Sequence, residues 1–213
     1  MDYYYGTLSG NSARSAFALG EAGVAYTPHP IAAPHGENRE APYLALNPMG
    51  KVPALVDGDL QLWESNAINW YLAEKHPAAR LLPASIAGRA SVQRWLMFQA
   101  SHVTPACAAF YRRTNQRVRT VWKADSDDKQ FAFGRSELGR YLPVLDQALA
   151  GRDWLEGDFS LADIAYAPHL AMVAQGEAGY DFAPTPNVQA WLKRLWARPA
   201  WQKAVEMSLA GAV

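Results

Sequence analysis

Residues 47–68, NPMGKVPALVDGDLQLWESNAI, contain two short apolar runs, a turn between them and the beginning of a helix. The runs Pro53–Val56 and Leu60–Trp63 are joined through Asp57-Gly58. This dipeptide is typical of a type I′ turn, because that turn needs positive φ at its central residues. Ser65 is a residue type that caps helices, and apolar residues recur after it at helical spacing. The stretch therefore predicts a β-hairpin followed directly by a helix.

The residues before this stretch predict alternating strands and helices. Asp2–Tyr5 is a short aromatic strand, Ser12–Gly23 carries an apolar helical stripe, and Val24–Ile31 is a second strand with prolines in its outer half. Ala41–Leu46 is a short helical turn that Asn47-Pro48 ends. The resulting order, β-α-β and then α-β-β-α, is that of a thioredoxin-like α/β domain.

The residues after the hairpin and its helix form a linker and then a segment with almost only helical signals. Segment 76–84 contains Pro77 and Pro83 and is the best candidate for a linker. Almost only helical signals follow, so we expect a thioredoxin-like domain over residues 1–80 and an all-α domain over residues 85–213. The helices expected in the second domain are Ala87–Arg113, Asp128–Ala150, 161–175, 187–197 and 199–208, with bends at Pro105, Pro143 and Pro168.

The composition favours a compact protein with a small or neutral partner. Of the 213 residues, 50% are hydrophobic and 19% are charged, which is typical of a globular rather than a disordered chain. Lysine and arginine number 20, aspartate and glutamate also number 20, and the net charge is zero. A neutral chain has no long-range field that would attract nucleic acid or an anionic membrane. No apolar run reaches the length of about 18 residues that spanning a membrane requires, so we expect a soluble protein.

Cys107 is the only cysteine of the chain. An intramolecular disulfide, a CxxC redox pair and a multi-cysteine metal site are therefore excluded, and a reducing cytoplasm is expected. Cys107 lies in the mostly apolar run Val103–Tyr111, where we expect it to be part of the core. The five histidines are scattered without the spacing of metal ligands, so no metal site is expected.

Three segments together resemble one protein family. Residues 154–165, WLEGDFSLADIA, have the spacing of a capping box from Ser160 to Asp163. With residues 47–55, NPMGKVPAL, and 62–68, LWESNAI, this segment resembles the cytosolic glutathione S-transferases. The resemblance implies their two-domain fold, glutathione as co-substrate, a hydrophobic electrophile as second substrate, and a cytoplasmic homodimer that serves detoxification. Among its members, the chain is most similar to bacterial-type enzymes activated by serine or asparagine rather than by cysteine.

The resemblance also implies which residues hold glutathione. The Val52-Pro53 bond is expected to be cis, with the Val52 backbone pairing with the cysteine of glutathione like an added strand. Glu64 and Ser65 are expected to bind the γ-glutamyl end, because the first N–H groups of a helix attract a carboxylate and Glu64 attracts an amino group. Lys51 is expected to pair with the glycine carboxylate. The alternatives are an ordinary proline at a strand start, a plain N-cap and a solvated lysine.

The thiol activator is expected in the turn between the first strand and the first helix. Residues 5–14, YGTLSGNSAR, are similar to the corresponding region of the family, with Ser9 at the catalytic hydroxyl position and Asn11 at that of a thiolate-contacting amide. A hydrogen bond to a charged group contributes about 1.5–3 kcal/mol, which lowers a thiol pKa by about one to two pH units. Ser12 is a third candidate, although a serine at a helix start is most often its N-cap. An activator among Tyr3–Tyr5 stays open, whereas a mixed-disulfide mechanism is disfavoured because the segment has no cysteine.

The second substrate is not identified by any local motif. We expect the electrophile in the cleft between the domains. His102 and Tyr111 are candidates to line this pocket, and the alternative for His102 is a histidine that is only packed or hydrogen-bonded within its helix. The alternatives are a glutathione-dependent peroxidase, isomerase or ether-cleaving enzyme on the same fold, or a non-catalytic module for glutathione binding or assembly. A basic run, residues 112–123, is interpreted as a solvated helix end, with an anion or nucleic-acid site as the alternative.

Overall fold

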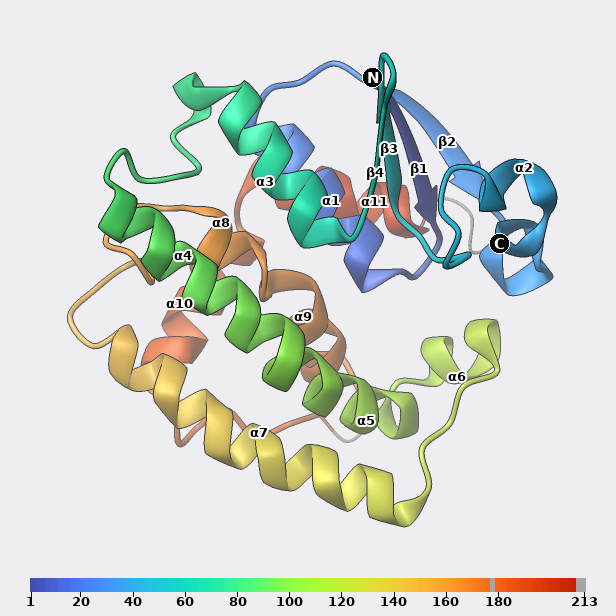
Figure 1. Ribbon diagram of the computed structural model, residues 1–213. Coiled ribbons are helices and arrows are strands. Elements are labelled where there is room, and N and C mark those ends of the chain that lie inside the picture. The colour runs from blue at the N-terminus through green and yellow to red at the C-terminus, as the bar shows by residue number, and fades with distance from the viewer. Residues whose placement is uncertain (177–178, 210–213) are drawn as a thin grey trace. The chain divides into compact units, whose positions relative to one another are not determined.

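The computed structural model describes residues 1–176 and 179–209. Contacts between residues divide the chain into two compact units. Residues 1–80 and the chain from Arg198 onward form the first unit, and Leu81–Ala197 forms the second. The first unit combines a sheet with helices, whereas the second is helical (Figure 1). The predicted fold class, an α/β thioredoxin-like domain followed by an all-α domain, is confirmed.

The sheet of the first unit has four strands in the order β2-β1-β3-β4 (Figure 1). Strand β1 (Asp2–Gly6) is parallel to β2 (Thr27–Ile31) and antiparallel to β3 (Ala54–Asp57). Strand β3 pairs antiparallel with β4 (Leu60–Trp63), and Gly58 between them has a φ of 61°. The predicted hairpin across Asp57-Gly58 is therefore confirmed.

Helices α1 (Gly10–Glu21), α3 (Ser65–Lys75) and α11 (Pro199–Leu209) gather on one side of this sheet (Figure 1). Helix α1 packs against both of the others. It begins at Gly10, two residues before the predicted start, because Ser9 rather than Ser12 is its N-cap. Between β2 and β3 the chain forms the short helix α2 (Ala41–Leu44), and brief 3₁₀ turns occur at Ala33–His35, Glu37–Arg39 and Pro77–Ala79.

The last described helix, α11, belongs to the first unit. The Arg198 guanidinium donates two hydrogen bonds of 2.7 Å to the Glu21 carboxylate. A Cβ added to Gly20 would lie 2.9 Å from the Ala200 Cβ, so α1 and α11 pack closely at this glycine. From the sequence we expected this helix to belong to the second domain. Its contacts with α1 place it in the first unit instead.

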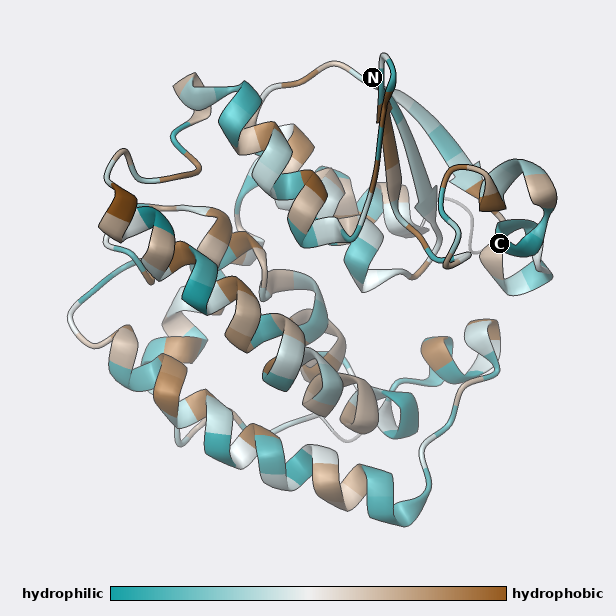
Figure 2. Cartoon of the chain, viewed as in Figure 1, coloured by the Kyte–Doolittle hydropathy of each residue, from teal (hydrophilic) through white to brown (hydrophobic). Residues whose placement is uncertain are grey.

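The second unit consists of helices that bury leucine and aromatic side chains. On α7 the buried residues Gly134, Leu138, Leu142 and Leu145 recur at helical spacing. Figure 2 shows hydrophilic and hydrophobic residues alternating along this helix, as expected for an amphipathic helix. The helical elements of the unit are α4 (Ile86–Phe98), a π-helical segment (Gln99–Val103), α5 (Thr104–Thr114), α6 (Gln116–Trp122), α7 (Asp128–Ala148), α8 (Leu161–Ile164), α9 (Ala167–Ala174) and α10 (Pro186–Trp196).

Two helices expected to be continuous are divided near prolines. The helix predicted over Ala87–Arg113 becomes α4, a π-helical segment and α5, with Pro105 in the first turn of α5. A proline ring collides with the carbonyl group four residues earlier, and a wider π turn at that place removes the collision. Likewise, Pro168 lies in the first turn of α9 instead of inside one helix over 161–175. Cys107 is fully buried in α5, as predicted.

The predicted capping box at the start of α8 is confirmed. The Ser160 hydroxyl accepts from the Ala162 N–H, and the Asp163 carboxylate accepts from the Ser160 N–H at 2.9 Å. Asp163 also accepts hydrogen bonds from the Leu155 N–H and the Trp191 indole N–H. This fully buried carboxylate therefore links α8, the preceding loop and α10.

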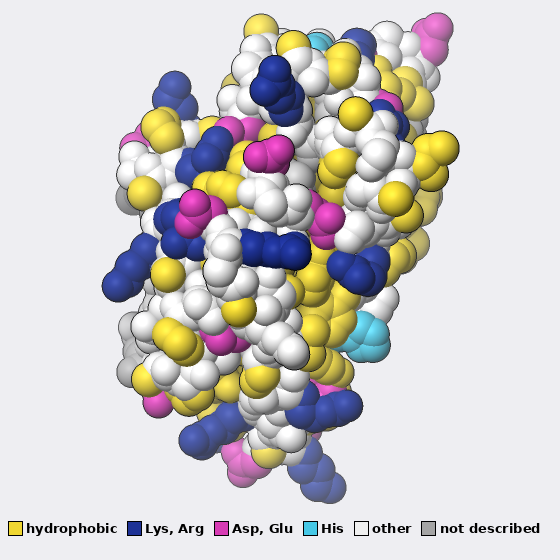
Figure 3. Space-filling model, turned by 90° about the vertical axis from the view of Figure 1, so that its left-hand side faces the viewer, with side chains coloured by type: hydrophobic (Ala, Val, Ile, Leu, Met, Phe, Trp, Pro, Cys, Tyr) yellow, Lys and Arg dark blue, Asp and Glu magenta, His cyan; other side chains and the backbone are white. Residues whose placement is uncertain are grey.

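The surface shows charges of both signs. On the face drawn in Figure 3, basic side chains lie among acidic and hydrophobic ones, in keeping with the zero net charge. Within residues 1–176 and 179–209, no helix combines the length and apolarity needed to cross a membrane. The same residues contain no cluster of three or more histidine, cysteine, aspartate or glutamate side chains arranged to hold a metal ion.

Candidate functional site

The loop before β3 is held in place by side chains from α2 and its surroundings. The Tyr43 hydroxyl and the Asn47 amide both donate to the Lys51 carbonyl, each at 2.6 Å. The Asn38 amide donates to the Gly50 carbonyl, also at 2.6 Å. Burial raises the pKa of Tyr43, so its phenol stays protonated and can donate. These bonds fix the backbone on both sides of Gly50, while the Lys51 side chain is exposed.

The Val52-Pro53 peptide bond is cis, as the family resemblance implied. Pairing between β3 and β1 begins at Ala54, so the Val52 backbone lies just outside this ladder. Gly6 at the end of β1 packs closely against Val52, because a Cβ on Gly6 would lie 2.7 Å from the Val52 Cγ2. The absence of a side chain at Gly6 therefore allows Val52 to lie against the end of β1.

The start of α3 lacks a capping side chain. Its N-cap is Glu64, with φ 69° and ψ 109°, and the Glu64 side chain makes no capping hydrogen bond. A positive φ at a non-glycine residue costs about 1–3 kcal/mol and recurs at functional sites. The N-cap side chain therefore does not occupy the start of α3, and a helix start of this kind favours an anion. The exposed Glu64 carboxylate lies beside it. The prediction that Ser65 caps this helix was wrong, because Ser65 is the first residue inside it.

Ser9 combines two hydrogen-bonding roles. Its side chain accepts from the Ser12 N–H at 3.2 Å and so caps α1. A hydroxyl has one donor besides its two acceptor lone pairs, so this cap leaves the Ser9 hydroxyl proton to bind another group. Ser9 is partly exposed, as contact with a ligand requires. The preceding residue, Leu8, has φ 52°, and its N–H donates to the Ser208 carbonyl of α11 at 3.1 Å.

The structure separates Ser12 and Tyr3 from this surface. Ser12 is fully buried, and its hydroxyl accepts from the Gly6 N–H at 3.1 Å. Tyr3 is also fully buried and donates to the Ser12 carbonyl at 2.6 Å, and burial raises its pKa well above the ordinary value. Ser12 therefore stabilises the turn through its buried hydrogen bond to Gly6. It is neither the N-cap of α1 nor a group exposed to a ligand.

Arg14 connects the two ends of the candidate site. Its guanidinium Nη1 donates to the Asn11 Oδ1 at 3.1 Å and to the Ser65 Oγ at 2.7 Å. Arg14 is only 3% exposed, whereas Asn11 is exposed. Because the Asn11 oxygen faces Arg14, its amide NH₂ is left to donate elsewhere. Sequence reasoning missed Arg14, although an arginine within the apolar stripe of the first helix is a signal that could have identified it.

The first unit thus brings together three segments distant in sequence. Arg14 joins Asn11 in the first turn of α1, next to the N-cap Ser9, to the start of α3. Gly6 lies against Val52 at the end of β1. The arrangement offers hydroxyl and amide donors, an uncapped helix start and a carboxylate. Such groups suit a ligand with an anionic nucleophile at its centre and a zwitterion at one end.

The residues singled out in the second unit lie in different environments. His102 is exposed in the π-helical segment, and its ring centroid lies 5.6 Å from that of Phe98 and 5.5 Å from that of Tyr141. The Tyr111 ring centroid is 6.2 Å from that of His169. The basic run does not continue one helix, because Asn115 ends α5 and caps the separate helix α6.

Comparison with known proteins gives consistent matches to one family. Residues 1–74 match the family model described as "Glutathione S-transferase, N-terminal domain", and residues 103–199 match "Glutathione S-transferase, C-terminal domain". Glutathione S-transferase 3 of Zea mays is 36% identical over 203 residues, which cover 93% of this chain and 90% of the relative. Glutathione S-transferase F9 of Arabidopsis thaliana is 33% identical over 205 residues, which cover 94% of each chain.

Solved structures of similar shape belong to the same family. The crystal structure of glutathione transferase F2 from Populus trichocarpa aligns with a TM-score of 0.90 at 26% identity and covers 99% of each chain. A glutathione transferase from Burkholderia graminis, solved with two glutathione molecules bound per subunit, aligns with a TM-score of 0.83 at 31% identity. That alignment covers 96% of this chain and 87% of the Burkholderia protein.

Proposed function

The chain belongs to the glutathione S-transferase family, and from that basis we propose which of its residues bind glutathione and activate its sulfur. The activity is the conjugation of glutathione, which serves as co-substrate. The alternatives of a peroxidase, an isomerase, an ether-cleaving enzyme or a non-catalytic module are not favoured, since the relatives are named as S-transferases.

Glutathione lies with its γ-glutamyl end at the start of α3. Its carboxylate receives hydrogen bonds from the first N–H groups of that helix and from Ser65, and its amino group pairs with Glu64. The cysteine backbone pairs with that of Val52, beside Pro53, and Lys51 pairs with the glycine carboxylate. The uncapped start of α3 beside the positive-φ residue Glu64 supports this orientation.

Ser9 and Asn11 stabilise the glutathione thiolate. The observation that carries this assignment is the Arg14 bridge, which links Asn11 to the same Ser65 that binds the γ-glutamyl end. The Ser9 hydroxyl proton and the Asn11 NH₂ are both left to donate to sulfur. Hydrogen bonds to a charged group contribute about 1.5–3 kcal/mol each, which is enough to raise the thiolate fraction at neutral pH about tenfold or more. The enzyme is thus of the serine or asparagine type, as in bacterial-type members.

The thiolate attacks a hydrophobic electrophile bound mainly by side chains of the second domain. Attack forms a bond from sulfur to carbon and releases a leaving group, or adds sulfur to an activated double bond. We also propose that the enzyme is a homodimer, that it acts in the cytoplasm and that it serves detoxification. We place residues 1–80 in the glutathione-binding domain, against which α11 packs, and the electrophile site in the helical domain that runs from residue 85 to residue 197.

Calorimetry at neutral pH combined with a chromogenic aryl chloride assay tests this proposal. We expect one saturable glutathione site per chain and glutathione-dependent conjugation. A matched peptide with an α-linked glutamate is expected to bind much more weakly, because its carboxylate cannot reach the start of α3. If glutathione does not associate, the binding assignment is ruled out. Normal binding without turnover on a panel of electrophiles indicates a non-catalytic module instead.

A further inference from the structure

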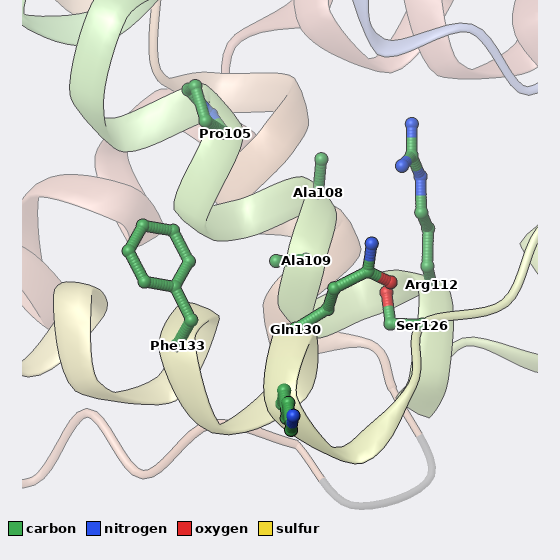
Figure 4. Close-up of a pocket in the computed structure, with 8 residues that line it drawn as sticks. Pro105, Ala108, Ala109, Arg112, Ser126, Gln130 and Phe133 are labelled. Atoms are coloured by element: carbon green, nitrogen blue, oxygen red, sulfur yellow. The ribbon is translucent and has the colours of Figure 1, made fainter.

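A pocket in the second unit and a helix contact in the first unit lie outside the proposed glutathione site. The pocket, about 550 Å³ in volume, opens between α5 and the start of α7, where Arg112 and Phe133 help to line it (Figure 4). The contact joins α11 to the turn before α1, where the Leu8 N–H donates to the Ser208 carbonyl at 3.1 Å. Because Leu8 directly precedes Ser9, this contact adjoins a residue proposed to activate sulfur.

The backbone of Leu8 has an unfavourable conformation. Its φ is 52°, in the left-handed region that a residue with a side chain rarely adopts. The next residue, Ser9, has φ −92° and ψ 109°, and its hydroxyl caps α1. A change of φ at Leu8 would rotate the chain on either side of it. The position of the Ser9 hydroxyl therefore depends on this conformation of Leu8.

The hydrogen bonds of this turn differ in where they lead. The Gly6 N–H donates to the Ser12 Oγ, which lies within the same segment of chain. The Leu8 N–H leaves the segment and reaches Ser208 in the last turn of α11. Ser208 is only 6% exposed, so water has little access to replace its carbonyl group as the acceptor. The contact with α11 thus favours the left-handed form of Leu8.

Helix α11 is anchored near both of its ends. Near its start, the Trp201 ring packs against Phe17 of α1, with ring centroids 5.6 Å apart, and both side chains are buried. Near its end, the Tyr26 hydroxyl donates to the Met207 Sδ at 3.6 Å. A packed helix shifts as a rigid element, so the fit of α11 against α1 determines where the Ser208 carbonyl lies.

Gly20 allows α1 and α11 to approach each other closely. A Cβ added to Gly20 would lie 2.9 Å from the Ala200 Cβ and 3.4 Å from the Ala200 Cα. Neither atom can rotate away, so a larger residue at this position would push the two helices apart. Gly20 lies in the last turn of α1, at the opposite end from Ser9. The spacing of the two helices can therefore be changed without altering a residue of the proposed glutathione site.

We propose that Leu8 and Ser208 are a positioning pair for the activation of glutathione, through which the packing of α11 on α1 directs the Ser9 hydroxyl toward sulfur. This inference rests on the role proposed above for Ser9. The Ser208 carbonyl keeps the Leu8 backbone in the left-handed region, and Leu8 fixes the place at which Ser9 begins α1. The extent of thiol activation is therefore adjustable from α11.

The spacing variant Gly20→Ala tests the proposal, with Ala200→Gly as its compensating partner. Ultraviolet difference spectroscopy of bound glutathione as a function of pH measures the pKa of the bound thiol. We expect Gly20→Ala to raise this pKa by about 0.5–1 pH unit and to lower kcat/KM at pH 6.5 about threefold to tenfold. The double variant Gly20→Ala/Ala200→Gly removes the collision and should restore both values to nearly those of the wild type.

The ligand S-methylglutathione separates sulfur activation from binding. It has the γ-glutamyl and glycine ends of glutathione but no thiol, so its dissociation constant should change less than twofold in Gly20→Ala. A loss of affinity for S-methylglutathione as large as the loss of kcat/KM, with the thiol pKa unchanged, would mean that α11 only supports the fold. That outcome would overturn the proposal.

Two further variants test the individual steps. Glycine accepts positive φ without strain, so in a Leu8→Gly background Gly20→Ala should shift the thiol pKa less than half as much. An undiminished shift would contradict the role of Leu8. Arg198→Gln removes the two hydrogen bonds to Glu21 without overpacking, and should shift the thiol pKa in the same direction as Gly20→Ala.

The wild type serves as the reference for both proposals. An unchanged thiol pKa in Gly20→Ala and in Arg198→Gln would overturn the positioning role of Ser208 while leaving the activation by Ser9 intact. Equal pKa values for free glutathione and glutathione bound to the wild type would instead rule out activation by Ser9, and this inference with it.

Discussion

The Arg14 Nη1 lies 2.7 Å from the Ser65 Oγ, and this hydrogen bond joins the N-terminal half of α1 to the first residue of α3. The same nitrogen also reaches Asn11 at 3.1 Å. A guanidinium suits this position because its rigid fork of donors can serve two acceptors at fixed angles. The buried Ser15 hydroxyl also donates to the Ser65 carbonyl at 3.3 Å, so two side chains of α1 hold the thiol-activating end and the glutamyl-binding end of the proposed site together.

Replacement of Arg14 is expected to weaken glutathione binding more than turnover. In Arg14→Gln, Ser65 and Asn11 lose their shared donor, so the KM for glutathione should rise about tenfold, which corresponds to about 1.4 kcal/mol. The KM for the electrophile should stay within twofold. Steady-state kinetics with each substrate varied in turn measures both values. An unchanged KM for glutathione would mean that Arg14 only supports the fold, a role that the melting temperature would reveal.

The double variant Ser9→Ala/Asn11→Ala is expected to lose most thiolate stabilisation. We expect kcat/KM to fall about tenfold to a hundredfold at pH 6.5, and the apparent pKa of the reaction to rise by about one to two pH units. Activity should recover above that pKa, because the thiolate then forms without help. A pH–rate profile checks this, with Ser9→Thr as the control that keeps the hydroxyl. Wild-type activity in the double variant would rule the assignment out.

Recognition of the γ-glutamyl group can be separated from recognition of the rest of glutathione. Glu64→Gln removes the charge proposed to meet the amino group and should raise the KM for glutathione about tenfold to a hundredfold. The dipeptide cysteinylglycine lacks this group, so its rate constant kcat/KM should be nearly the same in wild type and variant. Conjugation assays with both thiols measure the difference. Equal losses for the two thiols would place Glu64 away from the glutamyl end.

The contact between Gly6 and Val52 predicts a compensating pair of substitutions. Gly6→Ala places a Cβ 2.7 Å from the Val52 Cγ2 and should destabilise the fold by about 1–3 kcal/mol through overpacking, while also weakening glutathione binding. Val52→Ala removes the methyl groups that collide, so the double variant should be more stable than Gly6→Ala alone. Denaturant unfolding of the four proteins gives the coupling free energy. Purely additive losses would contradict the proposed contact.

The buried carboxylate of Asp163 predicts a pH dependence of stability. Burial raises its pKa to about 6 despite the hydrogen bonds it accepts. Between about pH 4 and pH 6 the folded protein therefore holds a proton that the unfolded chain has released, so this group's contribution to the free energy of unfolding decreases as pH rises. Over this pH range, Asp163 changes the free energy of unfolding by at most about 3 kcal/mol.

Urea unfolding at pH 4.5 and pH 7 of the wild type and Asp163→Asn measures this effect. The variant is expected to be less stable at both values, because an amide offers one acceptor oxygen to donors from Leu155, Ser160 and Trp191. Its stability should also change less with pH over this window. A steeper dependence in the variant than in the wild type would contradict the raised pKa.

Local sequence signals were sufficient for most of the fold. The Asp57-Gly58 turn defines its hairpin because few residues accept positive φ, and the Ser160 to Asp163 capping box defines the start of α8. The division near Pro105 was foreseen only as a bend, because a π-helical segment depends on how neighbouring helices pack. Helix α6 was not predicted, since its seven residues carry too little periodic signal.

The candidate site depends more on tertiary contacts. Ser9 and Ser12 are both serines near a helix start, and only the fold decides that Ser9 caps α1 while Ser12 is buried against Gly6. The role of Arg14 arises from a contact with a residue far along the chain, Ser65, which no local pattern encodes. The partial exposure of Ser9 and the full exposure of Asn11 to solvent likewise follow from the packing of α1.

The return of α11 to the first unit has a consequence for protein synthesis. A ribosome that has just completed α3 has made every residue proposed to touch glutathione, yet α1 still lacks the helix against which it packs. The Leu8 amide, next to Ser9, acquires its partner Ser208 only when α11 has emerged. We therefore expect nascent chains that end before α11 to have little affinity for glutathione, so that ligand-assisted folding begins late in translation.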